Sequence, residues 1–189
     1  MTRLRMQLFA LSLTAALLPV AAAAQQTAPV TAISKADMGA VLQHKGAEGA
    51  GVDRQMKVVD LGKYNMAIGV LRRGPTKPGA PVGAITHSQV TEVFYVVSGA
   101  ATLVTGFDVI KPVPFPADIE IVKIAVGPST NGTFKAGDRL PIAPGDIVIV
   151  PAGVPHGFDD IKDELTYLSF RPDPDHVLPA GYVHPALRK

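Results

Sequence analysis

The chain has 189 residues, enough for one domain of ordinary size with a real hydrophobic core. It contains no cysteine, which excludes disulfides, thiolate metal sites and cysteine nucleophiles. The formal net charge is only +2, and two of the 18 basic residues, Arg3 and Arg5, lie in an apolar N-terminal segment. The remaining chain has balanced charge, so nothing indicates binding to nucleic acid or to an anionic membrane surface.

Residues 1–24 have the pattern of a secretory signal peptide. Their basic start is followed by the apolar run Leu8–Val20 and by alanines, with Ala22 and Ala24 in the small-x-small arrangement of a cleavage site. The segment is too short for a flanked transmembrane helix, and we expect cleavage after Ala24; an uncleaved anchor is the alternative. The expected location is therefore the bacterial periplasm, with no membrane contact after cleavage.

The next segment, 25–55, is predicted to be a leader with one short helix. Ser34, followed three residues later by Asp37, is a variant of the capping box and predicts a helix that ends near Leu42. The glycine-rich residues 46–54 predict a loop. Neither the P-loop nor the dinucleotide-binding glycine spacing is present, which argues against a phosphate-binding loop.

From residue 56 to 171, short runs of β-forming residues alternate with turn signals. Glycine and proline clusters such as 72–83 and 111–118 separate the runs, and this pattern predicts an all-β sandwich or barrel. The proline-rich residues 172–189 predict an irregular tail on the domain surface. The predicted strands are 56–61, 63–72, 89–99, 100–106, 119–126, 145–150 and 164–170.

A histidine and a glutamate flank one of these strands. Alternate strand residues share a face, which places Glu92 with Phe94 and Val96. Both faces are otherwise apolar, so the strand is predicted to be buried on both sides. A buried carboxylate is costly unless it is paired, protonated or bound to metal. His87 lies just before the strand, and the intervening SQVT can form a turn that brings the two side chains together across a hairpin.

A second histidine lies in GDIVIVPAGVPHGFDD, residues 145–160. GDIVIVP predicts a buried strand, and Pro151 with Gly153 predicts a turn that places His156 at the start of the next strand. Two neutral imidazoles and a carboxylate can hold a metal ion with open coordination positions, provided that the two stretches meet in space. The alternative is a barrel in which these side chains only hydrogen-bond to one another.

The two stretches resemble the two signature motifs of the cupin superfamily. The first motif runs Gly, five residues, His-x-His, three or four residues, Glu, six residues, Gly, and GAPVGAITHSQVTEVFYVVSG fits every spacing. Only its first histidine position differs, where the chain has Ile85. The second motif runs Gly, five residues, Pro-x-Gly, two residues, His, three residues, Asn, and residues 145–160 depart from it only at Asp160.

This resemblance implies a single-domain antiparallel β-barrel of the jelly-roll type over residues 56–171, with one divalent metal ion inside it. Carried over position by position, His87, Glu92 and His156 are the retained ligands, and Ile85 replaces the fourth. Nitrogen and oxygen ligands do not choose among Fe, Mn, Ni and Zn.

The resemblance also implies a function class. We expect a metal-dependent enzyme that acts on a small organic molecule by dioxygenation, isomerisation, decarboxylation or lyase chemistry, among which the fold does not decide. The alternatives are a non-catalytic cupin that binds or stores a small ligand, and a metal-free barrel used for protein contacts. Many cupins are dimers, and the apolar second face of the strand that contains Glu92 permits a homodimer.

Other residues are weaker candidates for chemistry. Arg72 and Arg73 could bind an anionic substrate, although surface solvation is the ordinary role of such arginines. Tyr95 and Tyr167 could be general acids, although buried structural tyrosines are commoner. Gln89 could replace the missing ligand but is expected to face solvent.

In the tail, His176 and His184 are expected at the surface. Phe94 and Val96 are expected to line the cavity above the metal or, as the commoner role, to form core.

Overall fold

The computed structural model describes residues 29–45 and 51–188. The predicted signal peptide lies outside these residues, as do residues 46–50 of the predicted loop. Within the described ranges, no helix combines the length and the apolar character that crossing a bilayer requires.

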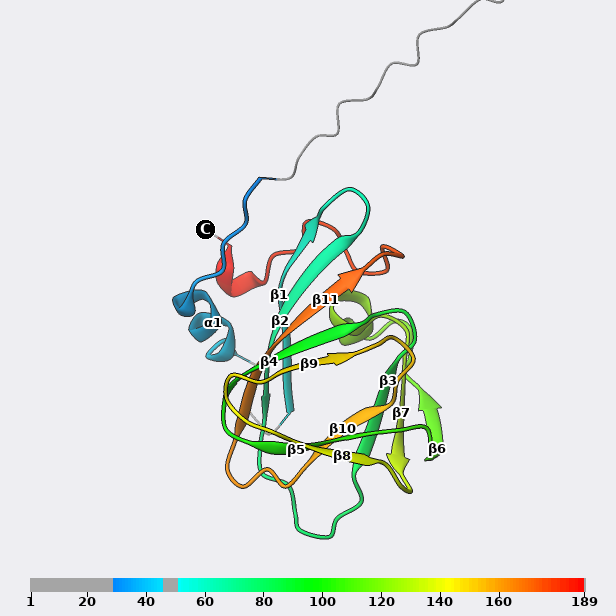
Figure 1. Ribbon diagram of the computed structural model, residues 1–189. Coiled ribbons are helices and arrows are strands. Elements are labelled where there is room, and N and C mark those ends of the chain that lie inside the picture. The colour runs from blue at the N-terminus through cyan, green and yellow to red at the C-terminus, as the bar shows by residue number, and fades with distance from the viewer. Residues whose placement is uncertain (1–28, 46–50, 189) are drawn as a thin grey trace, which may run out of the picture.

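Two antiparallel sheets form the body of the molecule, which confirms the predicted all-β fold (Figure 1). The first sheet contains, from edge to edge, β1 (Gly51–Asp60), β2 (Asn65–Arg73), β11 (Leu165–Asp173), β4 (Glu92–Ser98) and β9 (Ile147–Val150). The second contains β6 (Val109–Pro114), β7 (Ser129–Phe134), β3 (Gly83–His87), β10 (His156–Asp159), β5 (Ala101–Thr105) and β8 (Asp138–Ile142). The main core lies between the sheets and includes Leu71, Phe94, Leu103 and Tyr167.

Helix α1 (Lys35–Leu42) begins and ends as predicted. The Ser34 hydroxyl accepts a hydrogen bond from the Asp37 amide at 3.1 Å, and the Asp37 carboxylate accepts one from the Ser34 amide at 2.8 Å. The helix buries Val41 against β1 and β2, in a cluster that also includes residues of the C-terminal 3₁₀ turn η2 (Pro185–Leu187). Figure 1 shows this turn, in red, beside α1.

The strand β4 is buried on one face only, which corrects the prediction of burial on both. Phe94 and Val96 are buried, whereas Tyr95 and Val97 on the other face are each 41% exposed. The neighbouring β9, also predicted to be buried, exposes Ile147 and Ile149. Both faces of β4 are apolar, as predicted. The outer face is exposed because α1 packs on β1 and β2 and leaves the outer surface of β4 and β9 uncovered. The homodimer that this exposed face would permit stays a prediction.

Two predicted element assignments were wrong. β1 begins at Gly51, so residues 51–54 form strand rather than loop and pair with the end of β2. The apolar run 119–126 is not a strand but ends in the π-helical turn η1 (Val122–Val126). Its buried residues Val122, Ala125 and Val126 are spaced by three and four, as in a helix, rather than by two.

The strands β3, β6, β7 and β8 were not predicted, because polar residues, glycine or proline interrupt their apolar pattern. β6 contains Pro112 and Pro114, which an edge strand tolerates because its outer amides need no partner. β8, at the opposite edge of the same sheet, contains Pro141.

Candidate metal centre

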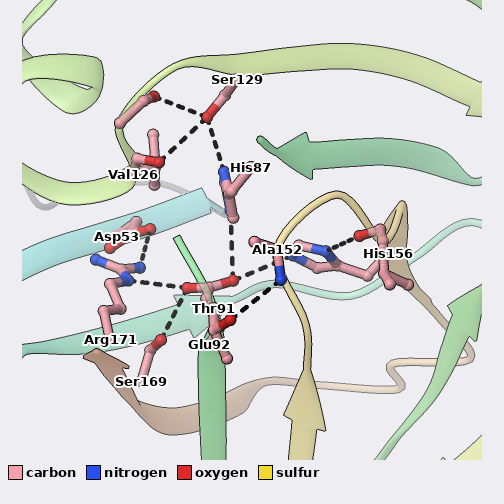
Figure 2. A network of polar contacts seen from close by, with 12 residues as sticks. Asp53, His87, Thr91, Glu92, Val126, Ser129, Ala152, His156, Ser169 and Arg171 are labelled. Atoms are coloured by element: carbon pink, nitrogen blue, oxygen red, sulfur yellow. Dashed lines mark hydrogen bonds and ion pairs between the residues drawn. The ribbon is translucent and has the colours of Figure 1, made fainter. Parts of the chain in front are cut away.

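Three ligand-type atoms converge between the two sheets. Nε2 of His87 lies 3.3 Å from Oε2 of Glu92, and Nε2 of His156 lies 3.2 Å from the same oxygen (Figure 2). The candidate ligand atoms all lie within 4.8 Å of one another, and the three side chains are at most 4% exposed. The structure therefore brings together the three residues that the motifs singled out, from the end of β3 and the starts of β4 and β10.

The route by which His87 reaches Glu92 differs from the predicted hairpin. β3 and β4 belong to different sheets, so residues 88–91 cross from one sheet to the other. The turn before β10 is fastened to this crossing: the Gly153 amide donates to the His87 carbonyl at 2.7 Å, and the Ala152 amide donates to Thr91 Oγ1 at 3.1 Å. Gly153 has a φ of 82°, which glycine adopts without strain. These bonds join the two motif stretches directly.

The second nitrogen of each imidazole fixes its tautomer. Nδ1 of His156 lies 3.1 Å from the Val154 carbonyl, which can only accept, so Nδ1 carries the proton. Nδ1 of His87 lies 2.8 Å from Ser129 Oγ, and that hydroxyl donates to the Gly127 carbonyl at 2.9 Å, so it accepts from His87. Both Nε2 atoms consequently present lone pairs toward Glu92. Burial lowers the pKa of His87, which favours the neutral imidazole.

Glu92 is held as a carboxylate by its other oxygen. Oε1 accepts hydrogen bonds from Ser169 Oγ at 2.8 Å and from Arg171 Nε at 2.9 Å. Burial alone would raise the pKa of Glu92, but the charge of Arg171 opposes this, and the pKa lies well below its usual range. Oε2 is left facing the two imidazoles, so three electron-pair donors point at one another. A cation between them relieves the repulsion, and this donor set fits a divalent metal.

Arg171 is the functional residue that sequence reasoning missed. It is fully buried, and besides Glu92 it binds Gln55 Oε1 through Nη1 at 3.0 Å and Asp53 Oδ2 through Nη2 at 2.6 Å. Gly69 leaves room for it, because a Cβ there would lie 3.1 Å from Nη1. The predicted strand ended at residue 170, one position before Arg171, whereas β11 continues to Asp173. The alternation Tyr167, Ser169, Arg171 was the available signal, since these residues share one strand face.

Ile85 lies beside the centre, where the motif has a histidine. It is two residues before His87 and pairs directly with His156 across the β3–β10 contact. It lines a cavity of about 390 Å³ together with His156. Gln89 is exposed, as expected, and does not take the missing place. Within the described residues, the candidate centre has three residues that could hold a metal ion.

The tyrosine and arginine candidates differ in whether their side chains point into the barrel or outward. Tyr167 is buried, its hydroxyl accepts a hydrogen bond from Arg73 Nε at 3.3 Å, and burial raises its pKa to about 12. Tyr95 points outward and lies away from the centre. Arg72 is partly exposed, with Nε 3.6 Å from Glu164 Oε2. Arg73 is half-buried and lines the cavity beside His156.

Phe94 and Val96 belong to the core, as expected, and the Phe94 ring centroid lies 5.9 Å from that of His156. His176 is exposed, as expected. His184, predicted at the surface, is buried, because η2 folds back against α1 and sets its ring 5.1 Å from that of His44.

Comparison with known proteins agrees with the motifs. Among solved structures, a Klebsiella pneumoniae protein with a double-stranded β-helix domain is similar at 14% identity and a TM-score of 0.47, over 78% of this chain and 93% of that one. The DMSP lyase DddQ of Ruegeria pomeroyi is similar at 12% identity and a TM-score of 0.42, over 74% and 54%. A variant of the Bacillus subtilis oxalate decarboxylase OxdC is similar at 19% identity and a TM-score of 0.42, over 70% and 28%. No curated protein matches. The model of the cupin family matches residues 49–184, and the chain belongs to this family.

Proposed function

We propose that the protein is a metal-dependent enzyme that acts on a small organic molecule, with one divalent ion, Fe, Mn, Ni or Zn, held by His87, Glu92 and His156. The observation that carries the proposal is the arrangement of lone pairs: two imidazole Nε2 atoms and one carboxylate oxygen point at one another between the sheets. Their other polar atoms are already bonded, which leaves these three for a cation.

The chain's own residues supply a pre-organised site with buried ligand side chains. Ser129 and the Val154 carbonyl orient the imidazoles, and Arg171 with Ser169 orients the carboxylate. Phe94 and Ile85 add apolar surface beside the ligands. A bound ion would supply Lewis acidity toward a substrate oxygen or a water molecule. With Ile85 at the first histidine position of the motif, more coordination positions remain for substrate and water.

One observation favours a second function, binding without turnover. Ile85 removes a ligand that the motif otherwise has, and a cupin that only holds a small molecule has no need of a complete centre. The reaction class, whether dioxygenation, isomerisation, decarboxylation or lyase chemistry, is open under the first proposal.

Elemental analysis of the purified mature protein tests the metal. We expect about one divalent ion per chain, because three convergent ligands with open positions form a typical site for one metal. His156→Ala should lose the ion, whereas Gln89→Ala, in the exposed part of the same crossing, should keep it. Wild-type protein that stays metal-free after separate exposure to Fe, Mn, Ni and Zn would refute both the site and the enzyme. Turnover of hydroxylated aromatics, keto acids or sugars by the loaded protein would then separate catalysis from binding.

We also propose export to the periplasm, supported by the pattern of residues 1–24. N-terminal sequencing of the protein from a periplasmic extract should begin near Gln25, and recovery of intact Met1 would refute cleavage.

A further inference from the structure

Arg73 is a charged side chain in the barrel that has no carboxylate of its own. It lies two residues beyond the buried Leu71 on the same strand face, and its Cζ lies 5.9 Å from the centroid of the Phe158 ring. Its Nε donates to the Tyr167 hydroxyl. In the part of the chain that the structure describes, Arg73 forms no ion pair.

The nearby acids are already in use. Asp53 and Glu92 act electrostatically on Arg73, but each pairs directly with Arg171, Asp53 through Oδ2 alone, since its Oδ1 is buried without a hydrogen-bond partner. Tyr167 does not neutralise it either, because a pKa of about 12 keeps that hydroxyl protonated at neutral pH. Together with Arg171 and Arg73, the two carboxylates make a charge-balanced group, but neither forms an ion pair with Arg73 itself. The guanidinium can therefore still pair directly with an anion from outside the chain.

The cavity of about 390 Å³ joins Arg73 to the candidate metal centre. Its lining includes Arg73 and His156, with Ile85, Phe158 and Ile161 as apolar walls and Asn131 as a further polar group. Ile85 pairs with His156 on one side and with Asn131 on the other, so this wall adjoins a ligand histidine directly. The volume is within the range of sites that hold small organic molecules.

We propose that this cavity binds a small organic carboxylate, whose anionic group pairs with Arg73 while its apolar part lies along Ile85 and Phe158 toward His156. Guanidinium groups favour carboxylates because two parallel hydrogen bonds can form between the planar groups. The hydrogen bond from Nε to Tyr167 holds the guanidinium in place and leaves its Nη groups for the ligand. Ile85 has a role in this arrangement, because an apolar side chain replaces a metal ligand where the substrate stem would lie.

This inference deepens the proposed function by naming the substrate class, but carboxylate binding itself depends on Arg73 and needs no metal. The two can therefore fail separately. Calorimetric titration of the chelated, metal-free mature protein tests it, with acetate, succinate and benzoate as probes and acetamide, succinamide and benzamide as their neutral counterparts.

For at least one pair we expect the carboxylate to bind about tenfold or more tightly than its amide, since one charge-assisted pair contributes that order of free energy. Arg73→Gln should abolish the preference, and Arg73→Lys should keep part of it. Arg72→Gln, the adjacent residue with a partly exposed side chain beside Glu164, is the matched control and should keep all of it. Circular dichroism and metal content identify a variant that has lost its fold rather than its anchor.

Two results would overturn the proposal. The first is equal binding, or no binding, of every carboxylate and its amide by folded wild-type protein. The second is a carboxylate preference that survives Arg73→Gln or is lost equally in Arg72→Gln. A preference that depends on Arg73 in a protein that never takes up metal would support this inference and refute the proposed enzyme.

Discussion

Arg171 and Arg73 both point into the barrel from the first sheet, but their surroundings differ. Arg171 is fully buried and binds Glu92, Asp53 and Gln55, so its charge is compensated within the chain. Arg73 is half-buried, donates to the neutral hydroxyl of Tyr167, and has no ion pair among the described residues. The two differ in whether the chain itself supplies the partner.

The difference separates a structural role from a ligand-binding role. Removing Arg171 would leave two buried carboxylates, Glu92 and Asp53, without a direct ion-pair partner. Removing Arg73 would leave only one neutral hydroxyl without a hydrogen bond. Arg171 orients Glu92 through the carboxylate oxygen that faces away from the histidines. Arg73 is available to an incoming molecule.

The largest expected effect is the loss of stability on Arg171→Gln. Breaking a buried ion pair by removing one partner costs about 3–5 kcal/mol in the free energy of unfolding. Arg73→Gln should cost less than about 1 kcal/mol, because only one hydrogen bond to a neutral group is lost. Urea denaturation of the two metal-free variants and the wild type measures both values. Equal losses in the two variants would show that the distinction between the arginines is wrong.

A second prediction concerns pH, because the groups around Arg171 titrate abnormally. The pKa of His87 is below its ordinary 6.5 and that of Glu92 is well below its ordinary 4.5, so the folded state binds fewer protons than the unfolded state. The contribution of these two groups to the free energy of unfolding is therefore complete above pH 6.5 and is lost as the pH drops. The loss begins with His87 below 6.5, and Glu92 adds to it below 4.5.

Urea denaturation of metal-free protein at intervals from pH 8 to pH 4 measures this dependence. His87→Gln should flatten the part of the curve that begins near pH 6.5 and leave the part below 4.5. Arg171→Gln should change the lower part, because without the arginine burial raises the pKa of Glu92. A wild-type stability that does not fall between pH 6.5 and pH 4 would contradict the neutral, ligand-ready state of the centre.

The sequence predicted the candidate ligands better than it predicted the residues that orient them. His87, Glu92 and His156 stand at fixed local spacings from glycines and prolines that shape the turns, so they could be identified without the fold. Strand alternation could have placed Arg171 on the inner face, but not its contact with Glu92, which depends on the register between β11 and β4 and joins residues 79 positions apart. His184 was misplaced for a similar reason, since its burial depends on how η2 packs against α1.

The strands, too, were predicted where local sequence determines them and missed where tertiary packing does. Runs rich in Val and Ile were found where alternation was regular, and β6 and β8 were missed because an edge strand can contain prolines that an apolar pattern does not predict. Burial on both faces of β4 was predicted wrongly, because a sequence shows that a face is apolar but not whether another element covers it. The apolar run at 119–126 was assigned the wrong period, although its buried residues have helical spacing.

A third prediction concerns the hydroxyls that orient the centre, where the effect on stability is far smaller than at Arg171. Ser129→Ala removes the acceptor for Nδ1–H of His87, and Ser169→Ala removes one of two donors to Glu92 Oε1. Either change should cost about 1 kcal/mol of unfolding free energy. Loss of such a supporting bond typically lowers metal affinity 10–100-fold. Ser129→Ala should have the larger effect on affinity, because Arg171 still holds Glu92 when Ser169 is changed.

Competition with a fluorescent chelator measures these affinities, and Ser88→Ala, an exposed hydroxyl next to His87, is the control. If Ser129→Ala binds metal as tightly as Ser88→Ala, the tautomer assigned to His87 does not depend on Ser129. If Ser169→Ala loses more affinity than Ser129→Ala, Arg171 alone does not fix the carboxylate. The buried arginine would then be a structural counter-ion rather than the group that orients the ligand, and its contrast with Arg73 would rest on stability alone.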